Sequence, residues 1–115
     1  MKRVLDDAEI ERLVEAFQAE INNGGFHQYF FNASGDEARE TLDALETIGA
    51  AGAAALLRRA CGRFPDGMPP AAWFSRQEVL LDVLSPDAFA EDDESFYQRN
   101  EDLTPIVDRY RSHRS

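Results

Sequence analysis

Two adjacent glycines, Gly24 and Gly25, interrupt a chain whose apolar residues otherwise repeat with helical spacing. The stripe before them follows the i, i+3, i+4, i+7 pattern of one helix face, and it consists of Ile10, Leu13, Val14, Phe17 and Ile21. Asp6, with Glu9 three residues later, predicts where that helix begins. Glycine accepts the left-handed conformation that ends many helices. We therefore expect the helix to stop at this pair, and at least one of the two glycines to have a positive φ.

The rest of the chain also repeats with helical spacing. Ser34-x-x-Glu37 and Ser75-x-x-Glu78 have the form of capping boxes, which predict the starts of two further helices. Gly49 is expected to end the first of these, and residues 64–70 carry the turn signals of a loop. Thr104-Pro105 predicts the start of the last helix. Five segments have core-facing residues, which are Ala38, Leu42, Leu45 and Ile48; Ala53, Leu56, Leu57, Ala60 and Phe64; Val79, Leu80, Val83 and Leu84; Phe89, Phe96 and Tyr97; and Ile106, Val107 and Tyr110.

No segment alternates as a strand would, so the sequence predicts an all-α fold. We expect a single compact domain over residues 1–115, with five or six short helices around one core. The centre of that core is predicted to hold Phe17, Phe30, Leu45 and Leu57. Residues 103–115 would form a C-terminal helix and a basic tail.

The charge balance is strongly acidic. Twelve lysines and arginines against 22 aspartates and glutamates give a net charge of −10, and three of those arginines lie in the last 13 residues. Such a body repels nucleic acid and anionic membranes, and its field attracts basic partners. The alternative is an acidic composition that serves only solubility.

The chain has no apolar run long enough to span a bilayer, and its first residues lack the apolar stretch of a secretory signal. The single cysteine, Cys61, excludes an internal disulfide and fits a reducing compartment. These features predict a cytoplasmic protein.

Candidates for catalysis or metal binding are few. His27 and His113 are the only histidines, and neither lies at metal-ligand spacing from Cys61 or a carboxylate. Cys61 as a nucleophile with His27 as its base is one interpretation, and a small buried apolar role for Cys61 is the favoured one. We expect no catalytic residue, no metal and no cofactor.

The segment after the glycines admits two interpretations. In the structural one, Tyr29, Phe30 and Phe31 anchor the chain in the core, while the amides of Asn23, Gln28 and Asn32 bind backbone groups at the turn. In the functional one, a ligand pocket is lined by His27, Gln28, Tyr29 and Asn32. The adjacent glycines, the aromatic residues and the amides favour the structural interpretation.

Acidic residues gather in two stretches with few basic residues nearby. The first stretch would place carboxylates on one side of a helix, where neighbours at i and i+4 stand about 5–6 Å apart. That spacing is of the same order as the spacing of phosphates along a nucleic-acid strand, so such rows could present a phosphate-like field to a basic groove. A solvated acidic face is the alternative. The predicted partner-binding carboxylates are Asp36, Glu37, Glu40, Asp43 and Glu46, then Asp87, Glu91, Asp92, Asp93, Glu94, Glu101 and Asp102.

A longer motif adds a family resemblance. The string NGG-x-x-QYF-x-N is formed by Asn23, Gly24, Gly25, Gln28, Tyr29, Phe30 and Asn32. Further matching segments are Ser34-Gly35-Asp36, Leu45-x-x-Ile48-Gly49-Ala50 and Asp92-Asp93-Glu94-x-Phe96-Tyr97. In these features the chain resembles a bacterial DNA-mimic protein family, catalogued mainly as a domain of unknown function.

The resemblance implies an all-α, non-enzymatic interaction protein. Its partner would be a basic DNA-binding protein, such as a transcription regulator or a nucleoid protein, with no direct contact to nucleic acid or membrane. Arg58, Arg59 and Arg63, with the basic tail, form a positive region that could pair with another copy in a homodimer, or could neutralise helix ends. Two alternatives remain, a toxin-neutralising immunity protein and a small-ligand binder or enzyme that uses the His27–Asn32 segment.

Overall fold

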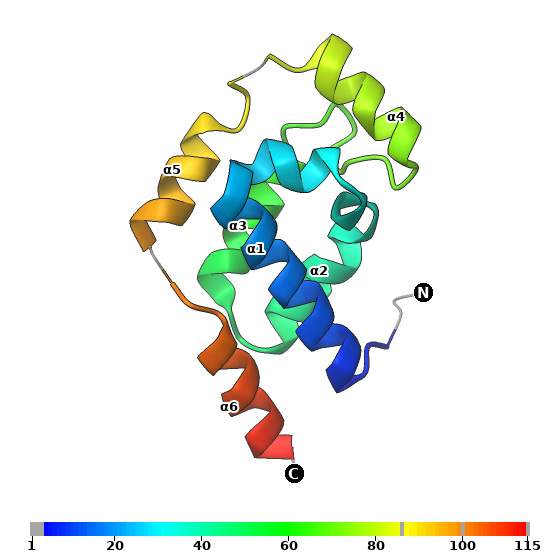
Figure 1. Ribbon diagram of the computed structural model, residues 1–115. Coiled ribbons are helices and arrows are strands. Elements are labelled where there is room, and N and C mark those ends of the chain that lie inside the picture. Colours follow the sequence, from blue (N-terminus) through cyan, green and yellow to red (C-terminus); the bar gives the residue numbers. More distant parts are fainter. Residues whose placement is uncertain (1–3, 86, 100, 115) are drawn as a thin grey trace.

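The computed structural model describes residues 4–85, 87–99 and 101–114. It contains six α-helices, a 3₁₀ turn and a π-helical turn, and these ranges hold no strand, which confirms the all-α prediction (Figure 1). In chain order the elements are α1 (Asp7–Phe31), η1 (Ala33–Glu37), α2 (Ala38–Thr47), α3 (Ala51–Cys61), α4 (Trp73–Glu78), η2 (Val79–Val83), α5 (Ala90–Arg99) and α6 (Thr104–Arg114). Among these helices none combines the length and the apolar character needed to cross a membrane.

Helix α1 is the central element of the fold. It packs against η1, α2, α4, α5 and α6, while α3 packs against α2 and α5 (Figure 1). The Asp6 carboxylate accepts a hydrogen bond from the Glu9 backbone N–H at 2.8 Å, and the Glu9 carboxylate accepts from the Asp6 N–H, so the predicted start of this helix is confirmed.

The two glycines break α1 into two helical segments that meet at a kink. Gly24 has φ −154° and ψ 16°, and Gly25 has φ 78° and ψ −173°, so the predicted positive φ is confirmed at Gly25. The first helical segment therefore ends at the expected pair, and a second segment continues α1 to Phe31. The reason is the spacing of the buried aromatic residues Phe26, Tyr29 and Phe30, because i, i+3 and i+4 form a second helical face against the core.

Helix α5 supplies hydrogen-bond partners for the backbone at this kink. The Asp93 carboxylate accepts a hydrogen bond from the Phe26 N–H at 2.7 Å, and the Tyr97 hydroxyl donates to the Ile21 carbonyl at 2.7 Å. A broken helix leaves backbone N–H and C=O groups without intrahelical partners. Asp93 and Tyr97 therefore act as caps for the two halves of α1.

Both predicted capping boxes inside the chain are wrong. Ser34 lies in η1 and donates to the Tyr29 carbonyl at 3.2 Å, and α2 begins only at Ala38 without a side-chain cap. Ser75 lies within α4, which begins two residues earlier and also lacks a side-chain cap. Gly49, with φ 83°, does lie just beyond the end of α2, as expected.

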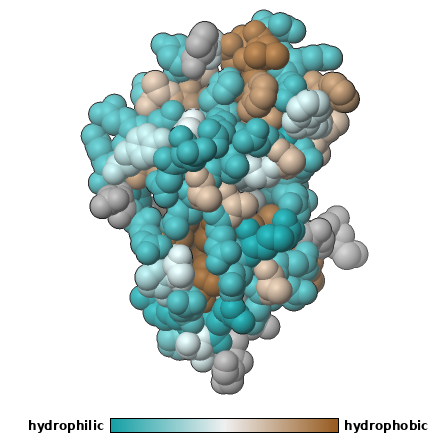
Figure 2. All heavy atoms as spheres, in the orientation of Figure 1, coloured by the Kyte–Doolittle hydropathy of each residue, from teal (hydrophilic) through white to brown (hydrophobic). Residues whose placement is uncertain are grey.

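The segment after α4 also departs from the predicted pattern. Residues Val79–Val83 form a π-helical turn, and the wider turn rotates their side chains away from the expected face. Leu80 is buried, but Leu81 is 65% exposed and Val83 62% exposed. The exposed apolar side chains of α4 and η2 are Trp73, Phe74, Leu81 and Val83. Figure 2 shows apolar surface at the top of the molecule over these two elements.

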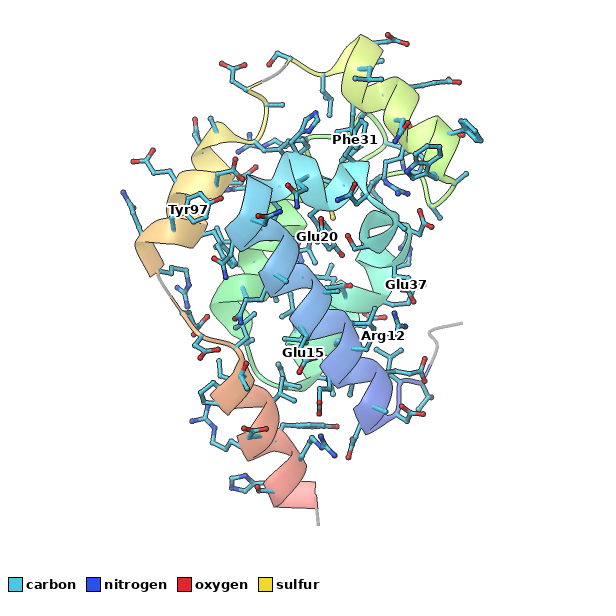
Figure 3. The ribbon with its side chains drawn as sticks, viewed as in Figure 1. Arg12, Glu15, Glu20, Phe31, Glu37 and Tyr97 are labelled. Carbon is cyan, nitrogen blue, oxygen red and sulfur yellow. The ribbon has the colours of Figure 1, made fainter. Side chains whose placement is uncertain are left out.

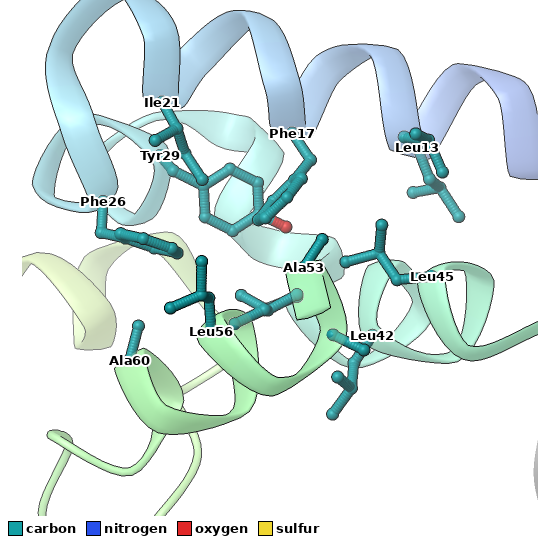
Figure 4. Close-up of a cluster of buried hydrophobic side chains, with 14 of the residues drawn as sticks. Leu13, Phe17, Ile21, Phe26, Tyr29, Leu42, Leu45, Ala53, Leu56 and Ala60 are labelled. Carbon is teal, nitrogen blue, oxygen red and sulfur yellow. The ribbon is translucent and has the colours of Figure 1, made fainter. Parts of the chain in front are cut away.

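The core lies beneath α1, between it and the α2–α3 pair (Figure 4). All four residues predicted at its centre, Phe17, Phe30, Leu45 and Leu57, are fully buried. Phe17 makes edge-to-face contacts with Phe26, Tyr29 and Phe96, so the aromatic residues after the kink interlock with those before it.

Candidate partner-binding surface

The carboxylates predicted on the second helix are divided between η1 and α2, and several bind arginines. Asp36 accepts a hydrogen bond from Arg76 at 2.7 Å. Glu37 forms a two-pronged ion pair with Arg12, with both N–O distances at 2.9 Å (Figure 3). Glu46 lies 3.3 Å from Arg58, and Glu40 and Asp43, the other two predicted here, are half-buried. This row is therefore less open and less negative than the sequence predicts.

Arg76, which holds Asp36, is fully buried. Its guanidinium donates all five of its hydrogen bonds, at 2.5–3.1 Å, to Asp36 and to the carbonyls of Phe30, Asn32, Pro70 and Ala71. Two of these carbonyls lie at the C-terminal end of α1, where a cation also suits the helix dipole. The Arg76 side chain therefore joins the α4 segment to the end of α1.

Gly35 makes room for this contact. A Cβ at Gly35 would lie 2.8 Å from the Arg76 guanidinium Nε and 2.9 Å from the Phe30 Cα, and the second of these atoms is backbone that cannot turn aside. The Ser34-Gly35-Asp36 segment thus has a structural role, because its glycine admits the arginine and its aspartate binds it.

Asp92, predicted as a partner-binding carboxylate on α5, is fully buried. Its oxygens accept hydrogen bonds from Arg59 Nε at 2.6 Å and from Arg63 Nε and a terminal nitrogen at 3.1 and 3.0 Å. These contacts join α5 to α3. The prediction that Asp92 belongs to an exposed surface is wrong, because the carboxylate forms an internal ion pair with Arg59 on α3 and with Arg63 just beyond the end of that helix.

The other carboxylates of the second stretch differ in their surroundings. Asp93 is half-buried at the kink, and burial raises its pKa, against the opposing effect of the Phe26 N–H. Glu91 and Glu94 are exposed, and a Glu91 carboxylate oxygen lies 4.0 Å from the Arg63 guanidinium. Asp87 and Asp102 are exposed, while Glu101 lies 3.3 Å from Arg99.

An acidic groove that the sequence did not reveal lies where α1, α6 and the end of α5 meet. Two adjoining cavities, of about 90 and 540 Å³, share Gln18 and Thr104 in their walls. The carboxylate-bearing residues that line this acidic groove are Glu11, Glu15, Glu101, Asp102 and Asp108, and among the described residues no lysine or arginine lines either cavity. Figure 3 shows Glu15 on α1 beside this junction.

Two of the five groove carboxylates bind arginines and three do not. Glu11 pairs with Arg111, and Glu101 with Arg99. Glu15, Asp102 and Asp108 are exposed and form no ion pair with another residue in the described part of the chain. The Thr104 backbone N–H holds the pKa of Asp102 below its usual range, so this carboxylate is ionised at neutral pH. The groove can therefore accept a cationic side chain from outside.

One sequence signal could have indicated this groove. Glu11 and Glu15 stand at i and i+4 on the polar side of the first stripe, beside the buried Val14. The other three groove carboxylates, Glu101, Asp102 and Asp108, come from α6 and the segment before it. Asp108 was expected to lie within a basic tail. Because the groove joins residues about 90 positions apart, only the packing of α6 on α1 assembles it.

The motif residues after the kink have mainly structural roles. The Gln28 and Asn32 amides donate to Glu20 at 3.2 and 2.8 Å, so they bind a carboxylate across the kink and not the backbone groups that we expected. Figure 3 shows Glu20 on α1. Asn23 is exposed. Tyr29 does line a cavity, but His27, Gln28 and Asn32 do not line it.

No hydrogen bond joins the two predicted catalytic candidates, Cys61 and His27, in the described part of the chain. Cys61 is buried, and burial raises the pKa of its thiol to about 12, so it is not a thiolate nucleophile at neutral pH. The His27 ring stacks on Phe31, on the half-exposed side of α1. Among the described residues, no three histidine, cysteine or acidic side chains are placed to hold a metal.

The basic region predicted for self-pairing is largely engaged within the chain. Arg59 and Arg63 bind Asp92, Arg58 lies next to Glu46, and Arg111 of the tail binds Glu11. The homodimer stays a prediction.

A family model described as "DMP19-like protein" matches residues 11–113, which span every helix from α1 to α6. No curated protein and no solved structure matches the chain.

Proposed function

Since the chain belongs to the family of DMP19-like proteins, we propose that it is a non-enzymatic DNA mimic that binds the basic, DNA-binding surface of another protein. The partner would be a transcription regulator or a nucleoid protein in the cytoplasm. Binding would cover the surface that the partner offers to DNA, so the two ligands would exclude one another.

The acidic groove is the observation that carries this proposal. It offers three exposed carboxylates, Glu15, Asp102 and Asp108, that pair with no arginine among the described residues, around a cavity that can take a basic side chain. Exposed carboxylates of this kind attract a basic surface over long range and lose that attraction as salt screens them. The exposed Glu91 and Glu94 on α5 extend the negative surface, whereas the buried Asp92 does not.

The test begins with capture of partners from native cytoplasm on the immobilised protein at low salt, followed by their identification. A captured partner is then titrated with the protein, with and without a DNA duplex of about 20 base pairs as competitor. We expect the partner to be a DNA-binding protein, the duplex to displace it, and its affinity to fall steeply with added salt.

Two charge-matched variants locate the binding surface. One is Glu15→Gln/Asp102→Asn/Asp108→Asn in the groove, and the other is Asp66→Asn/Glu78→Gln/Asp82→Asn at three exposed carboxylates on the loop, α4 and η2. Both variants lose three negative charges. We expect the groove variant to weaken binding at least about 10-fold, and the other variant by only about 2-fold through its change in net charge.

Equal effects of the two variants would contradict the groove as the binding surface. Capture of a partner whose binding is indifferent to DNA would contradict the mimic itself. A captured toxin that is not displaced by DNA would instead support an immunity protein.

A further inference from the structure

The exposed apolar side chains of this protein are concentrated on one short segment. Six large apolar side chains are exposed among the described residues, and four of them lie on α4 and η2, which are Trp73, Phe74, Leu81 and Val83. These four residues are the α4–η2 surface, and Figure 2 shows apolar side chains gathered over these two elements. The rings of Trp73 and Phe74 are in contact, with their centroids 4.9 Å apart. Soluble proteins that gather exposed apolar side chains in one place commonly bind a partner there.

The contacts beneath this surface fix its position. Arg76, which is buried under the same segment, donates hydrogen bonds to Asp36 and to four backbone carbonyls. The Trp73 indole N–H and the Gln77 amide both donate to the Phe31 carbonyl, at 3.0 and 3.3 Å. Because these contacts hold α4 against the end of α1, the outer face of α4 stays toward solvent.

The π-helical turn of η2 adds to this exposure. The Leu84 N–H donates to the Val79 carbonyl at 2.9 Å, which closes the wider i, i+5 turn. Leu80 is buried within this turn, whereas Leu81 and Val83 are exposed. Such turns are rare and are frequently found at functional sites. A segment that is firmly anchored and still keeps apolar side chains in water fits a preformed docking surface.

The exposed charges on the same segment are acidic. Glu78 follows Phe74 by four positions and precedes Leu81 by three, so it lies on the same helical face as both. Asp82 comes directly after Leu81, and both carboxylates are exposed. The single basic residue of α4 and η2 is Arg76, which is fully buried. A partner complementary to this surface therefore combines apolar side chains with positive charge.

A second copy of the protein does not supply that combination. In a symmetric contact between two α4–η2 surfaces, Glu78 and Asp82 of one copy would face the same two acids of the other, and like charges repel. The basic helix α6 exposes no large apolar side chain in its described part, because Val107 is buried and Ile106 and Tyr110 pack against the core. The acidic residues also disfavour an anionic membrane.

We propose that the α4–η2 surface binds a basic amphipathic helix from another protein. Apolar side chains of that helix cover Phe74 and Leu81. Its lysines or arginines lie next to Glu78 and Asp82. The segment spans about 15 Å, which is the length of three turns of a bound helix with anchors at i, i+3, i+4 and i+7. The surface shares no residue with the acidic groove, so this helix and a partner in the groove can bind at the same time.

Trp73 provides a local readout, because it is the only tryptophan in the chain. The probe is a synthetic helix of about 18 residues with leucines on one face and lysines on the other. Its control has the same composition, in an order that spreads the leucines around the helix. Each peptide is titrated into the full-length protein, and Trp73 fluorescence is recorded. We expect the amphipathic peptide to shift the emission to shorter wavelength, with a dissociation constant below about 100 μM, and the control to bind at least about 10-fold more weakly.

Two variants test the apolar and the charged parts of the surface. Phe74→Ser/Leu81→Ser changes two exposed positions, so we expect circular dichroism to report an unchanged fold and the affinity for the amphipathic peptide to fall at least about 10-fold. Glu78→Gln/Asp82→Asn should weaken binding about 3-fold to 10-fold and reduce its dependence on salt.

The groove variant Glu15→Gln/Asp102→Asn/Asp108→Asn is the matched control. It loses more negative charge than Glu78→Gln/Asp82→Asn, yet it should bind the amphipathic peptide within about 2-fold of the original protein. Because the groove carboxylates have no part in this contact, failure of the peptide to bind leaves the proposed function standing, and failure of the groove leaves this surface standing.

Four results would overturn the proposal. The amphipathic peptide could leave Trp73 emission unchanged, the control peptide could bind as tightly, or the groove variant could weaken binding as much as Phe74→Ser/Leu81→Ser does. The fourth is a dimer, detected by light scattering, that Phe74→Ser/Leu81→Ser converts to a monomer, since the surface would then bind a second copy. A shift of Trp73 emission with phosphatidylcholine vesicles but not with the peptide would likewise replace the helix by a membrane surface.

Discussion

Two arginine–carboxylate contacts hold this fold together in opposite ways. At the α4 end, the cation Arg76 is fully buried and its carboxylate partner, Asp36, keeps 44% of its side-chain surface exposed. At the α3–α5 contact, the carboxylate Asp92 is fully buried, and its partners Arg59 and Arg63 stay 43% and 33% exposed. The burial of one partner decides which charge is lost from the surface and which remains.

The difference determines what each contact leaves available for binding. Burying Arg76 keeps a carboxylate at the surface but joins it to a cation below, so Asp36 contributes little net negative field. Burying Asp92 removes an acid altogether and leaves two cations near α5. Acidic residues that cluster in a sequence can therefore belong to buried ion pairs. The negative field at the protein surface can be assigned only after these ion pairs are identified.

The largest effect is expected from Arg76→Met. Loss of the guanidinium removes all five hydrogen bonds, and the carbonyl of the fully buried Phe30 loses its donor. We expect the free energy of unfolding to fall by about 3–5 kcal/mol, as for a broken buried ion pair. Urea unfolding followed by circular dichroism measures it, with the exposed Arg39→Met on α2 as the control. A loss of less than about 1 kcal/mol would show that Arg76 does not hold α4 on α1.

A smaller loss is expected from Asp92→Asn, although Asp92 is as buried as Arg76. Its two arginine partners are partly exposed and can turn their charges into water, so fewer groups are left unsatisfied. We expect a loss of about 2–3 kcal/mol in the same urea experiment. Glu94→Gln, an exposed carboxylate two residues later on α5, is the control and should change stability by less than about 0.5 kcal/mol. If Asp92→Asn lowered the free energy of unfolding more than Arg76→Met, the contact of the buried Arg76 would not be the stronger of the two.

Asp36→Asn tests the exposed end of the Arg76 contact. Arg76 keeps its four carbonyl acceptors in this variant, and the asparagine side-chain oxygen can still accept a hydrogen bond. We expect a loss of about 1 kcal/mol, measured by urea unfolding at low and high salt. The loss should shrink at high salt, because screening already weakens the original half-exposed pair. A loss equal to that of Arg76→Met would mean that Asp36, and not the set of carbonyls, provides most of the contact.

Asp93→Asn is expected to change the free energy of unfolding least, and the size of that change depends on pH. Burial raises the pKa of Asp93 in the folded protein, so the folded state binds this proton more tightly than the unfolded state does. The stabilisation from that proton is present at low pH and is lost as pH rises through the usual aspartate range to the raised pKa. Asparagine can accept from the Phe26 N–H but does not titrate.

We therefore expect Asp93→Asn to gain stability relative to the original protein between about pH 3 and pH 6, by a few tenths of a kcal/mol, since solvent screens a half-buried group. Urea unfolding at several pH values measures the difference. Asp93→Ala, which lacks the acceptor, should instead be less stable at every pH, and a gain with alanine would contradict the capping role.

Local sequence patterns were sufficient for most of the helices. The spacing from Ile10 to Ile21 and the Asp6 cap determined the start and the buried face of α1, and the positive φ expected at one of the two glycines is found at Gly25. The helical geometry breaks at the glycine pair as expected, and the aromatic residues after the kink resume a helical face that extends α1 to Phe31. Ser34 and Ser75 matched a capping pattern but lie inside elements, because their neighbours pack and hydrogen-bond elsewhere.

The candidate site was less predictable than the fold. The excess of acidic residues and the resemblance carried by the Asn23–Asn32 motif came from the sequence alone, and the family match agrees with that resemblance. The residues of the acidic groove were mostly missed, because Glu15 and Asp108 become neighbours only when α6 packs on α1.

The sequence by itself thus determined the helical class, the central core residues and the net charge of this protein, because each depends on composition or on spacing within one helix. Only the tertiary structure decided which charged side chains form internal ion pairs and which remain exposed at the surface. Asp92 and Glu94 stand two residues apart on the same helix, yet the first is buried between two arginines and the second is exposed. An electrostatic contact depends on distance and burial, and for residues far apart in the chain both are decided by how the helices pack.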